Sequence, residues 1–96
     1  MIQIFPTSLF KKDLKRLKRK RVDITLLDEV VELIIKNDMK SKTELIRRHK
    51  MHKLKGNWKG SNECHVANVG DWLLVWRVKD GKAYLQRTGE HDEIFK

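Results

Sequence analysis

The sequence contains little of several features on which many proteins depend. It has one cysteine, Cys64, so no disulfide can form within the chain, and a reducing cytoplasm is the expected location. It has one proline, Pro6, and no apolar run long enough to cross a membrane. Residues 1–10 lack the cationic start, apolar stretch and cleavage site of an export signal. These absences favour one cytoplasmic domain that spans residues 1–96.

Positive charge is what the sequence has in excess. The formal net charge is +9, and the segment from Lys11 to Arg21 holds eight Lys or Arg against one Asp. A basic block of this kind predicts an anionic partner, such as a nucleic acid, an acidic protein or an anionic membrane surface. A solvated helix face explains the same residues equally well, so the block alone identifies no partner.

The beginning of the chain predicts a short strand and a basic helix. Residues 1–5 are largely β-branched or aromatic and stop at Pro6, which is typical of a short strand. Thr7 or Ser8 can cap the helix that follows. The apolar stripe of this helix consists of Phe10, Leu14 and Leu17. The stripe can dock on a core while the Lys and Arg side chains point outward.

A second helix is expected to begin near Asp23 or Thr25 and to end at Asn37-Asp38. Thr25 and Asp28 have the spacing of a capping box. Apolar residues lie on two sides of this helix, so it should be the most buried one. Its main face holds Ile24, Leu27, Val31, Ile34 and Ile35, with Val30 at the margin and Leu26 and Leu33 opposite. Residues 39–54 show no clear period and are expected to be mostly a connecting loop.

The last third of the chain predicts a β-meander. Residues 56–62 form a loop rich in glycine and asparagine, and residues 63–69 alternate like a strand. Residues 71–78 are almost continuously apolar and should form a central strand. Asp80-Gly81 is a strong hairpin signal before the closing strand, 83–88. The predicted fold is therefore α+β, a small single domain of order β-α-α-β-β-β. Its sheet is mainly antiparallel, with two helices packed on one face.

Four histidines are the candidates for acid–base chemistry, because imidazole changes its charge nearest to neutral pH. They are His49, His52, His65 and His91. No metal site is expected, because Cys64 and His65 are adjacent and would point to opposite faces of a strand. Cys64 is expected to be a small buried thiol and not a nucleophile. The loop GNWKG lacks the spacing of a phosphate-binding loop.

The second half of the chain carries several short motifs in a fixed order. They are His52, Leu54–Gly60 (LKGNWKG), Cys64-His65, Asp71-Trp72, Arg87–His91 (RTGEH) and Ile94-Phe95. This set resembles the YafQ-type branch of the RelE/ParE superfamily, bacterial type II toxin–antitoxin toxins that cut messenger RNA. The resemblance implies a RelE-like fold. The chain has about two more residues than the family between His65 and Asp71, so a longer hairpin is expected here.

The resemblance implies an endoribonuclease that acts on mRNA in the ribosomal A site and needs no cofactor or metal ion. In this reaction the ribose 2′-hydroxyl attacks the neighbouring phosphorus and the 5′-oxygen leaves. The products are a 2′,3′-cyclic phosphate or 3′-phosphate and a 5′-hydroxyl. A base, an acid and stabilising cations are required. The implied partners are a cognate antitoxin, mRNA and ribosomal RNA; the free toxin is expected to be a monomer.

The resemblance also suggests acid–base roles for individual residues. His91 would donate a proton to the leaving oxygen. Either His65 or His52 would act as the base or orient the 2′-hydroxyl, and the choice between them stays open. Asp71 would fix the tautomer of a histidine.

The remaining expected site residues bind RNA. Arg87 would clamp a phosphate, because a planar guanidinium can hold it through two hydrogen bonds. Phe95 would either stack on a base or pack the segment around His91. Trp58 and Trp72 are expected to serve packing. The expected RNA path contains Lys53, Lys55 and Lys59, and the basic helix would meet ribosomal RNA through Lys11, Lys15 and Arg19.

Two other functions fit part of the sequence. A binder of nucleic acid or protein without catalytic activity would use the basic helix but not the histidines, and the superfamily includes toxins that poison DNA gyrase. A paralogue inactivated by the longer hairpin is the other alternative. The histidine set favours the enzyme, because pure binding does not require it.

Overall fold

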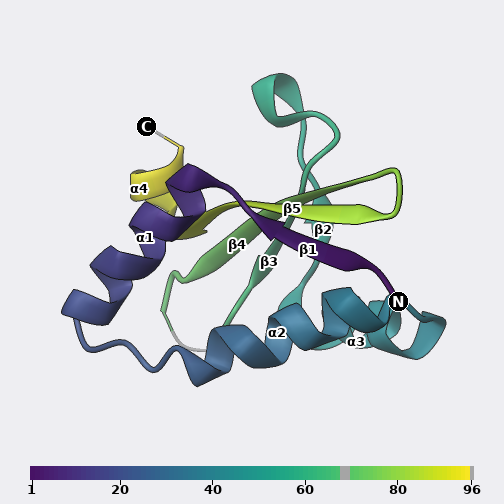
Figure 1. The fold of residues 1–96 in the computed structure, drawn as a ribbon, viewed down its shortest axis with the longest axis horizontal. Helices are drawn as coiled ribbons and strands as arrows, with labels where there is room; N and C mark the ends of the chain where they lie inside the picture. Colours follow the sequence, from purple (N-terminus) through teal and green to yellow (C-terminus); the bar gives the residue numbers. More distant parts are fainter. Residues whose placement is uncertain (68–69, 96) are drawn as a thin grey trace.

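The structure is a computed structural model and describes residues 1–67 and 70–95 (Figure 1). Its elements are β1 (Gln3–Pro6), α1 (Ser8–Arg19), α2 (Thr25–Lys36), α3 (Met39–His49), β2 (His52–Lys53), the 3-10 turn η1 (Gly56–Trp58), β3 (Asn62–His65), β4 (Leu73–Lys79), β5 (Lys82–Gly89) and α4 (His91–Ile94). The predicted α+β class and the predicted order of the main elements are confirmed. Two of the helices and one strand were not predicted.

The five strands form one sheet in the order β1-β5-β4-β3-β2. β1 pairs with β5 in parallel, and the other neighbours are antiparallel, so the mainly antiparallel sheet is confirmed. β4 is the middle strand, as its apolar run predicts. Asp80 and Gly81 have φ angles of 53° and 74°, which suits the tight β4–β5 hairpin predicted from this dipeptide.

The ends of the first two helices test three local predictions. The Thr7 side chain accepts a hydrogen bond from the Phe10 amide, so the predicted cap of α1 is confirmed. Asn37 ends α2 in the left-handed conformation. The capping box at Thr25 is wrong, because Thr25 is already the first helical residue. Instead the Asp23 carboxylate accepts a hydrogen bond from the Thr25 amide.

The prediction of a loop over residues 39–54 is wrong. Met39–His49 is helix α3, and β2 follows it. The Asp38 carboxylate caps this helix by accepting a hydrogen bond from the Ser41 amide at 2.7 Å, and Lys50 ends it with φ 54°. Only Ser41 and Leu45 of α3 are buried, so the helix leaves almost no apolar period in the sequence.

One face of the sheet carries the main core. The largest apolar cluster joins residues of α1, α2 and α3 to inward residues of β3, β4 and β5. In α2 the buried face consists of Leu27, Val30 and Ile34. Val30 is fully buried, so its predicted place at the margin of this face is wrong.

The opposite face carries a second, smaller cluster. It contains Leu73, Val75 and Ile94, with Leu54, Trp58 and Phe95 packed against it. Thus α4 and the loop around η1 cover part of this face, whereas α2 and α3 lie on the other side of the sheet (Figure 1). The prediction of two helices on one face is corrected to three helices there and a short fourth helix opposite.

The β3–β4 connection is only partly described. β3 ends at His65, earlier than the predicted strand over residues 63–69, and Asn68 and Val69 lie outside the described residues. The expected longer hairpin falls on this connection. Among residues 1–67 and 70–95, no helix has the length and apolar character needed to cross a membrane.

Candidate active site

The strand register places four side chains in one row across the sheet. His52 of β2 is opposite Glu63 of β3, Glu63 is opposite Val75 of β4, and Val75 is opposite Arg87 of β5. Residues directly opposite in antiparallel strands project from the same face. Val75 belongs to the smaller cluster, so the imidazole, the carboxylate and the guanidinium all lie on the face that carries α4.

A pocket of about 280 Å³ opens on this face. It is lined by His52, Leu54, Lys55, Trp58, Glu63, His91 and Phe95. Four expected site residues, His52, Lys55, His91 and Phe95, therefore lie together. A larger crevice of about 340 Å³ lies on the other face, but its polar lining contains only lysine and asparagine side chains. Of these two pockets, the smaller one contains the histidine and glutamate side chains.

His91 is the first residue of α4, and its main chain is firmly held. Its amide donates a hydrogen bond to Oδ2 of Asp71 at 3.0 Å. Glu90 and Glu93 form a capping box around it, with the Glu90 amide 2.8 Å from Oε1 of Glu93. The imidazole itself is largely exposed and lies 5.0 Å from the ring of Phe95. The arrangement fixes the backbone, while the exposed ring, whose Nδ1 lies 3.7 Å from Oδ1 of Asp92, remains open to a substrate.

His52 pairs with a carboxylate that the sequence did not single out. Its Nδ1 lies 3.0 Å from the carbonyl oxygen of Lys50, and its Nε2 lies 3.3 Å from Oε1 of the buried Glu63. A carbonyl only accepts, so Nδ1 must carry a proton. Asp71 contacts the main chain of His91, so Glu63 makes the histidine contact expected of Asp71.

His65 lies outside this pocket. It lines a neighbouring pocket of about 390 Å³ with Arg48, Lys50, Ala67 and Gly70. Its carbonyl oxygen lies 2.9 Å from Nδ1 of His49. His65 is two residues from Glu63 on the same strand and so projects from the same face. Of the two candidate bases, only His52 lies in the pocket with His91.

Arg87 is bound to a carboxylate from α1. Its Nε lies 2.8 Å and its Nη2 3.1 Å from the two oxygens of Asp13, and Nη2 is 3.4 Å from the carbonyl of Glu93. The Asp13 hydrogen bonds raise the pKa of Arg87 above its usual range. The Nε–Nη2 edge is therefore occupied. A phosphate cannot be clamped through that edge, which is a correction to the expected geometry.

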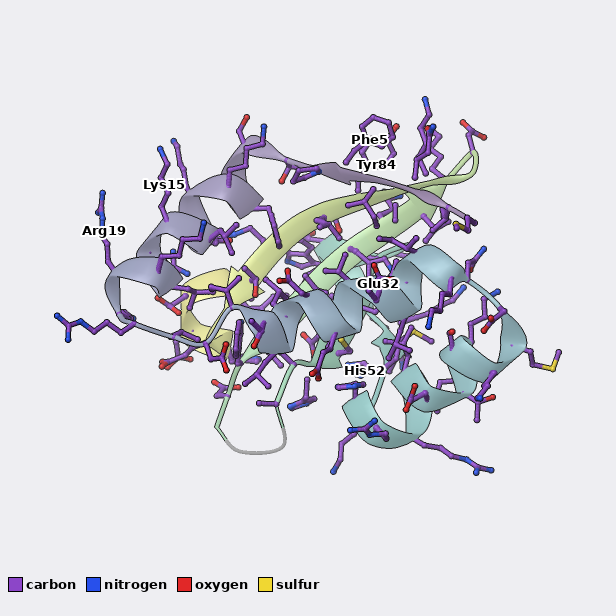
Figure 2. All side chains as sticks on the ribbon, turned by 60° about the horizontal axis from the view of Figure 1, so that its bottom comes forward. Phe5, Lys15, Arg19, Glu32, His52 and Tyr84 are labelled. Atoms are coloured by element: carbon purple, nitrogen blue, oxygen red, sulfur yellow. The ribbon has the colours of Figure 1, made fainter. Side chains whose placement is uncertain are left out.

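The predicted RNA-contacting lysines and arginine are all exposed. Lys53, Lys55 and Lys59 line an open depression beside η1. On α1 the other three, Lys11, Lys15 and Arg19, recur every four residues and so share one helix face. Figure 2 shows Lys15 and Arg19 pointing away from the sheet. The cations thus occupy two separate surfaces, one beside the pocket and one on the first helix.

The other singled-out residues have structural contacts. Trp58 packs edge-on against Phe95, with ring centroids 5.4 Å apart. Nε1 of Trp72 donates to Oγ1 of Thr88 at 2.9 Å. Cys64 is fully buried, and burial raises the pKa of its thiol, so it stays protonated. In the part of the chain that the structure describes, no three His, Cys, Asp or Glu side chains are placed to hold a metal ion.

Comparison with known proteins identifies the class first: small bacterial toxins of type II toxin–antitoxin systems. The family model described as "Bacterial toxin of type II toxin-antitoxin system, YafQ" matches residues 2–96. The chain therefore belongs to the YafQ toxin family. This match confirms the resemblance drawn from the motifs in the second half and extends it to the first half.

Individual relatives agree with this assignment. The mRNA interferase toxin YafQ of Escherichia coli K12 is 31% identical over 86 residues, which cover 90% of this chain and 87% of the relative. The YafQ structure from E. coli BL21(DE3) superposes with a TM-score of 0.85 at 28% identity over the whole of both chains. A metal-bound toxin from Helicobacter pylori gives 0.83 at 35% identity, covering 99% of this chain and all of the other.

Proposed function

We propose that this protein is an endoribonuclease that cleaves mRNA on the ribosome and is inhibited by a cognate antitoxin. Family membership and the relative named as an mRNA interferase support this proposal. The observation that carries it is the pocket itself, because two imidazoles and a buried carboxylate line one opening beside exposed lysines. Acid–base cleavage of RNA needs a base, an acid and stabilising cations, and these groups can supply all three.

In the proposed reaction, the scissile phosphate lies between His52 and His91. The 2′-hydroxyl gives up its proton to the His52–Glu63 pair and attacks the phosphorus. His91 then protonates the departing 5′-oxygen, and its exposed ring on a fixed backbone suits this role. The products are a 2′,3′-cyclic phosphate, or the 3′-phosphate after hydrolysis, and a 5′-hydroxyl. His65, in the neighbouring pocket, is the second candidate for the base.

Charge and stacking complete the proposed site. The ammonium group of Lys55 and the guanidinium of Arg87 stabilise the negative charge that develops on the phosphate. Phe95 lies between Trp58 and His91, with ring distances of 5.4 Å and 5.0 Å. This placement supports both of its expected roles: the ring packs on Trp58, and its remaining surface can stack on a base.

The proposed partners are anionic. The exposed stripe Lys11, Lys15 and Arg19 and the lysines beside η1 suit the phosphates of ribosomal RNA and mRNA. A related E. coli YafQ has been solved in a complex with DinJ, with a TM-score of 0.83 at 29% identity over 99% of this chain and 98% of that chain. By analogy, a small antitoxin protein is proposed to bind and inhibit this toxin.

The test is mRNA cleavage on programmed ribosomes by the wild type and by His91→Gln. The variant should cut about 10² to 10⁴ times more slowly, which is the usual contribution of one acid–base partner. His49→Gln is the matched control, because it makes the same change at a histidine that does not line the pocket. A wild-type rate of cleavage by His91→Gln would show that His91 is not the acid. Absence of cleavage by the wild type would reject the function.

A further inference from the structure

The one acidic residue of the basic segment 11–21 is also one of the most buried residues in the protein. Asp13 lies on α1 and is 2% exposed. Its two carboxylate oxygens accept four hydrogen bonds: from Nε and Nη2 of Arg87, from Nη1 of Arg16 and from the amide of Thr88. The lengths are 2.8, 3.1, 2.8 and 3.1 Å respectively. Asp13 is therefore a buried junction between α1 and β5.

Burying a carboxylate at such a junction costs free energy unless each of its hydrogen-bond partners is present. Burial alone would raise the pKa of Asp13, but the hydrogen bonds from Arg87, Arg16 and Thr88 outweigh it and hold this pKa below its usual range. A buried carboxylate that lost these partners would be strongly unfavourable. The contacts join residues 74 and 75 positions apart in the sequence, so they fix α1 against the end of β5.

A second link continues from α1 to the helix that carries His91. Nε of Arg16 lies 2.7 Å from Oε2 of Glu93, and Nζ of Lys20 lies 3.6 Å from the same oxygen. The Arg16 N–H does not point at this oxygen, so the contact is an ion pair without a hydrogen bond. Glu93 also caps α4 through the Glu90 amide. Arg16 and Lys20 therefore hold the side chain that closes the first turn of α4.

Gly89 shows how tightly this link is packed. A Cβ atom at this position would lie 2.7 Å from Nη2 of Arg16 and 2.9 Å from Oε1 of Glu93. Its φ of 149° is also one that side-chain-bearing residues rarely adopt. The structure places the Arg16–Glu93 pair directly over this glycine. The glycine permits close packing beneath that pair.

The geometry leaves Arg87 with one open end. Asp13 takes Nε and Nη2, and Nη2 also faces the Glu93 carbonyl, so within residues 1–67 and 70–95 only Nη1 makes no hydrogen bond. A phosphate that approaches Arg87 would meet the guanidinium end-on at a fixed place. Phosphate recognition by Arg87 would then depend on the carboxylate behind it.

We propose that Asp13 is a positioning residue of the cleavage reaction. It holds the Arg87 guanidinium in place from behind, and through Arg16 and Glu93 it holds the helix that carries His91. This inference rests on the proposed ribonuclease function. Asp13 touches neither substrate nor reacting atoms, so it acts only through Arg87 and α4.

The kinetic test compares Asp13→Asn with Asp28→Asn on programmed ribosomes. Asp28 is an exposed carboxylate on α2, so the control makes the same chemical change away from the site. Asp13→Asn should lower kcat about 10- to 100-fold, the scale expected when reacting groups are displaced by about 1 Å. KM should change less than about twofold, because the exposed lysines that bind RNA are intact. An unchanged kcat, or a loss confined to KM, would overturn the proposal.

A double-mutant cycle separates positioning from general damage. If Asp13 acts partly through Arg87, the rate loss of the double variant Asp13→Asn/Arg87→Lys should be clearly smaller than the product of the two single losses. Independent losses that multiply in the double variant would show that Asp13 does not work through the arginine. Each variant is first checked for an intact fold by circular dichroism and thermal unfolding.

A structural readout keeps the inference separate from the proposed function. Amide hydrogen exchange should accelerate in α4 of Asp13→Asn by about tenfold or more and stay unchanged in α2. Unchanged exchange in α4 would refute the positioning link even if activity fell. Faster exchange in a protein whose wild type cuts no RNA would reject the ribonuclease and leave the link standing. If Asp13→Asn does not fold, both measurements are made on Arg16→Gln instead, because Arg16 is more exposed than Asp13.

Discussion

The two faces of the sheet differ in the helices that cover them and in the side chains that they carry. Three helices cover one face and enclose the main apolar cluster. The other face has a small apolar cluster, a four-residue helix and the row of His52, Glu63 and Arg87. Because side chains alternate along a strand, β4 sends Leu74 and Trp76 to the first face and Leu73 and Val75 to the second. One strand thus supports both the core and the site.

The largest expected effect concerns the face of the sheet that α1, α2 and α3 cover. Leu74 is fully buried in the main cluster, so Leu74→Ala should lower the free energy of unfolding by about 2–5 kcal/mol. Ile94→Ala, on the face that carries α4, should lower the free energy of unfolding by less, because fewer groups surround Ile94 and its short helix can adjust. Denaturant unfolding of both variants measures the difference. Equal losses would mean that the two faces contribute alike to stability.

The next largest effect concerns the rate of cleavage by the site on the face that carries α4. Glu63→Gln removes the carboxylate beside Nε2 of His52 but keeps an amide of the same shape. Cleavage should fall about 10- to 100-fold, equivalent to roughly 1.4–2.7 kcal/mol, if the pair accepts the 2′ proton. Glu29→Gln, on the exposed side of α2, should cut at the normal rate. Normal cleavage by Glu63→Gln would leave His65 as the better candidate for the base.

The smallest effect is an acid dependence of the link between α1 and β5. The folded-state pKa of Asp13 is lowered, so its stabilisation is complete above its unfolded pKa of about 3.9 and is lost as pH falls through the folded value. Thermal unfolding of the wild type and Asp13→Asn should therefore differ by several degrees at pH 7, and this difference should shrink as pH falls below about 3.9. A Tm difference that stays constant on acidification would show that the loss comes from packing.

Local sequence rules predicted much of the fold. Thr7 capped its helix, Asn37 ended another, and Asp80-Gly81 formed the hairpin, because each feature depends on a few neighbouring residues. Helix α3 was missed because its only buried residues are Ser41 and Leu45, which form no apolar stripe. The Asp38 cap was the available signal for it. For α4, the Glu90–Glu93 spacing was the corresponding signal.

The site was harder to predict because its key pairings are tertiary. The family motifs brought His52, His91 and Phe95 forward, and these three line one pocket. Glu63 and Asp13 carry no motif of their own. Their partners lie 11 and 74 residues away and are defined only by strand register and helix docking. A single acid in a basic run suggests a surface counter-charge, whereas this one is buried at a junction.

The parallel pairing of β1 with β5 has a consequence for synthesis of the chain. Thr7 bonds to the carbonyl of Leu85 across a separation of 78 residues, so the first strand has no neighbour until residues 82–85 exist. Closing so long a loop is entropically slow compared with local contacts. The same late segment supplies Arg87 and His91. During synthesis, the pocket can therefore assemble only after the last residues of β5 and α4 leave the exit tunnel. A prematurely ended chain would lack both the strand that pairs with β1 and the proposed acid.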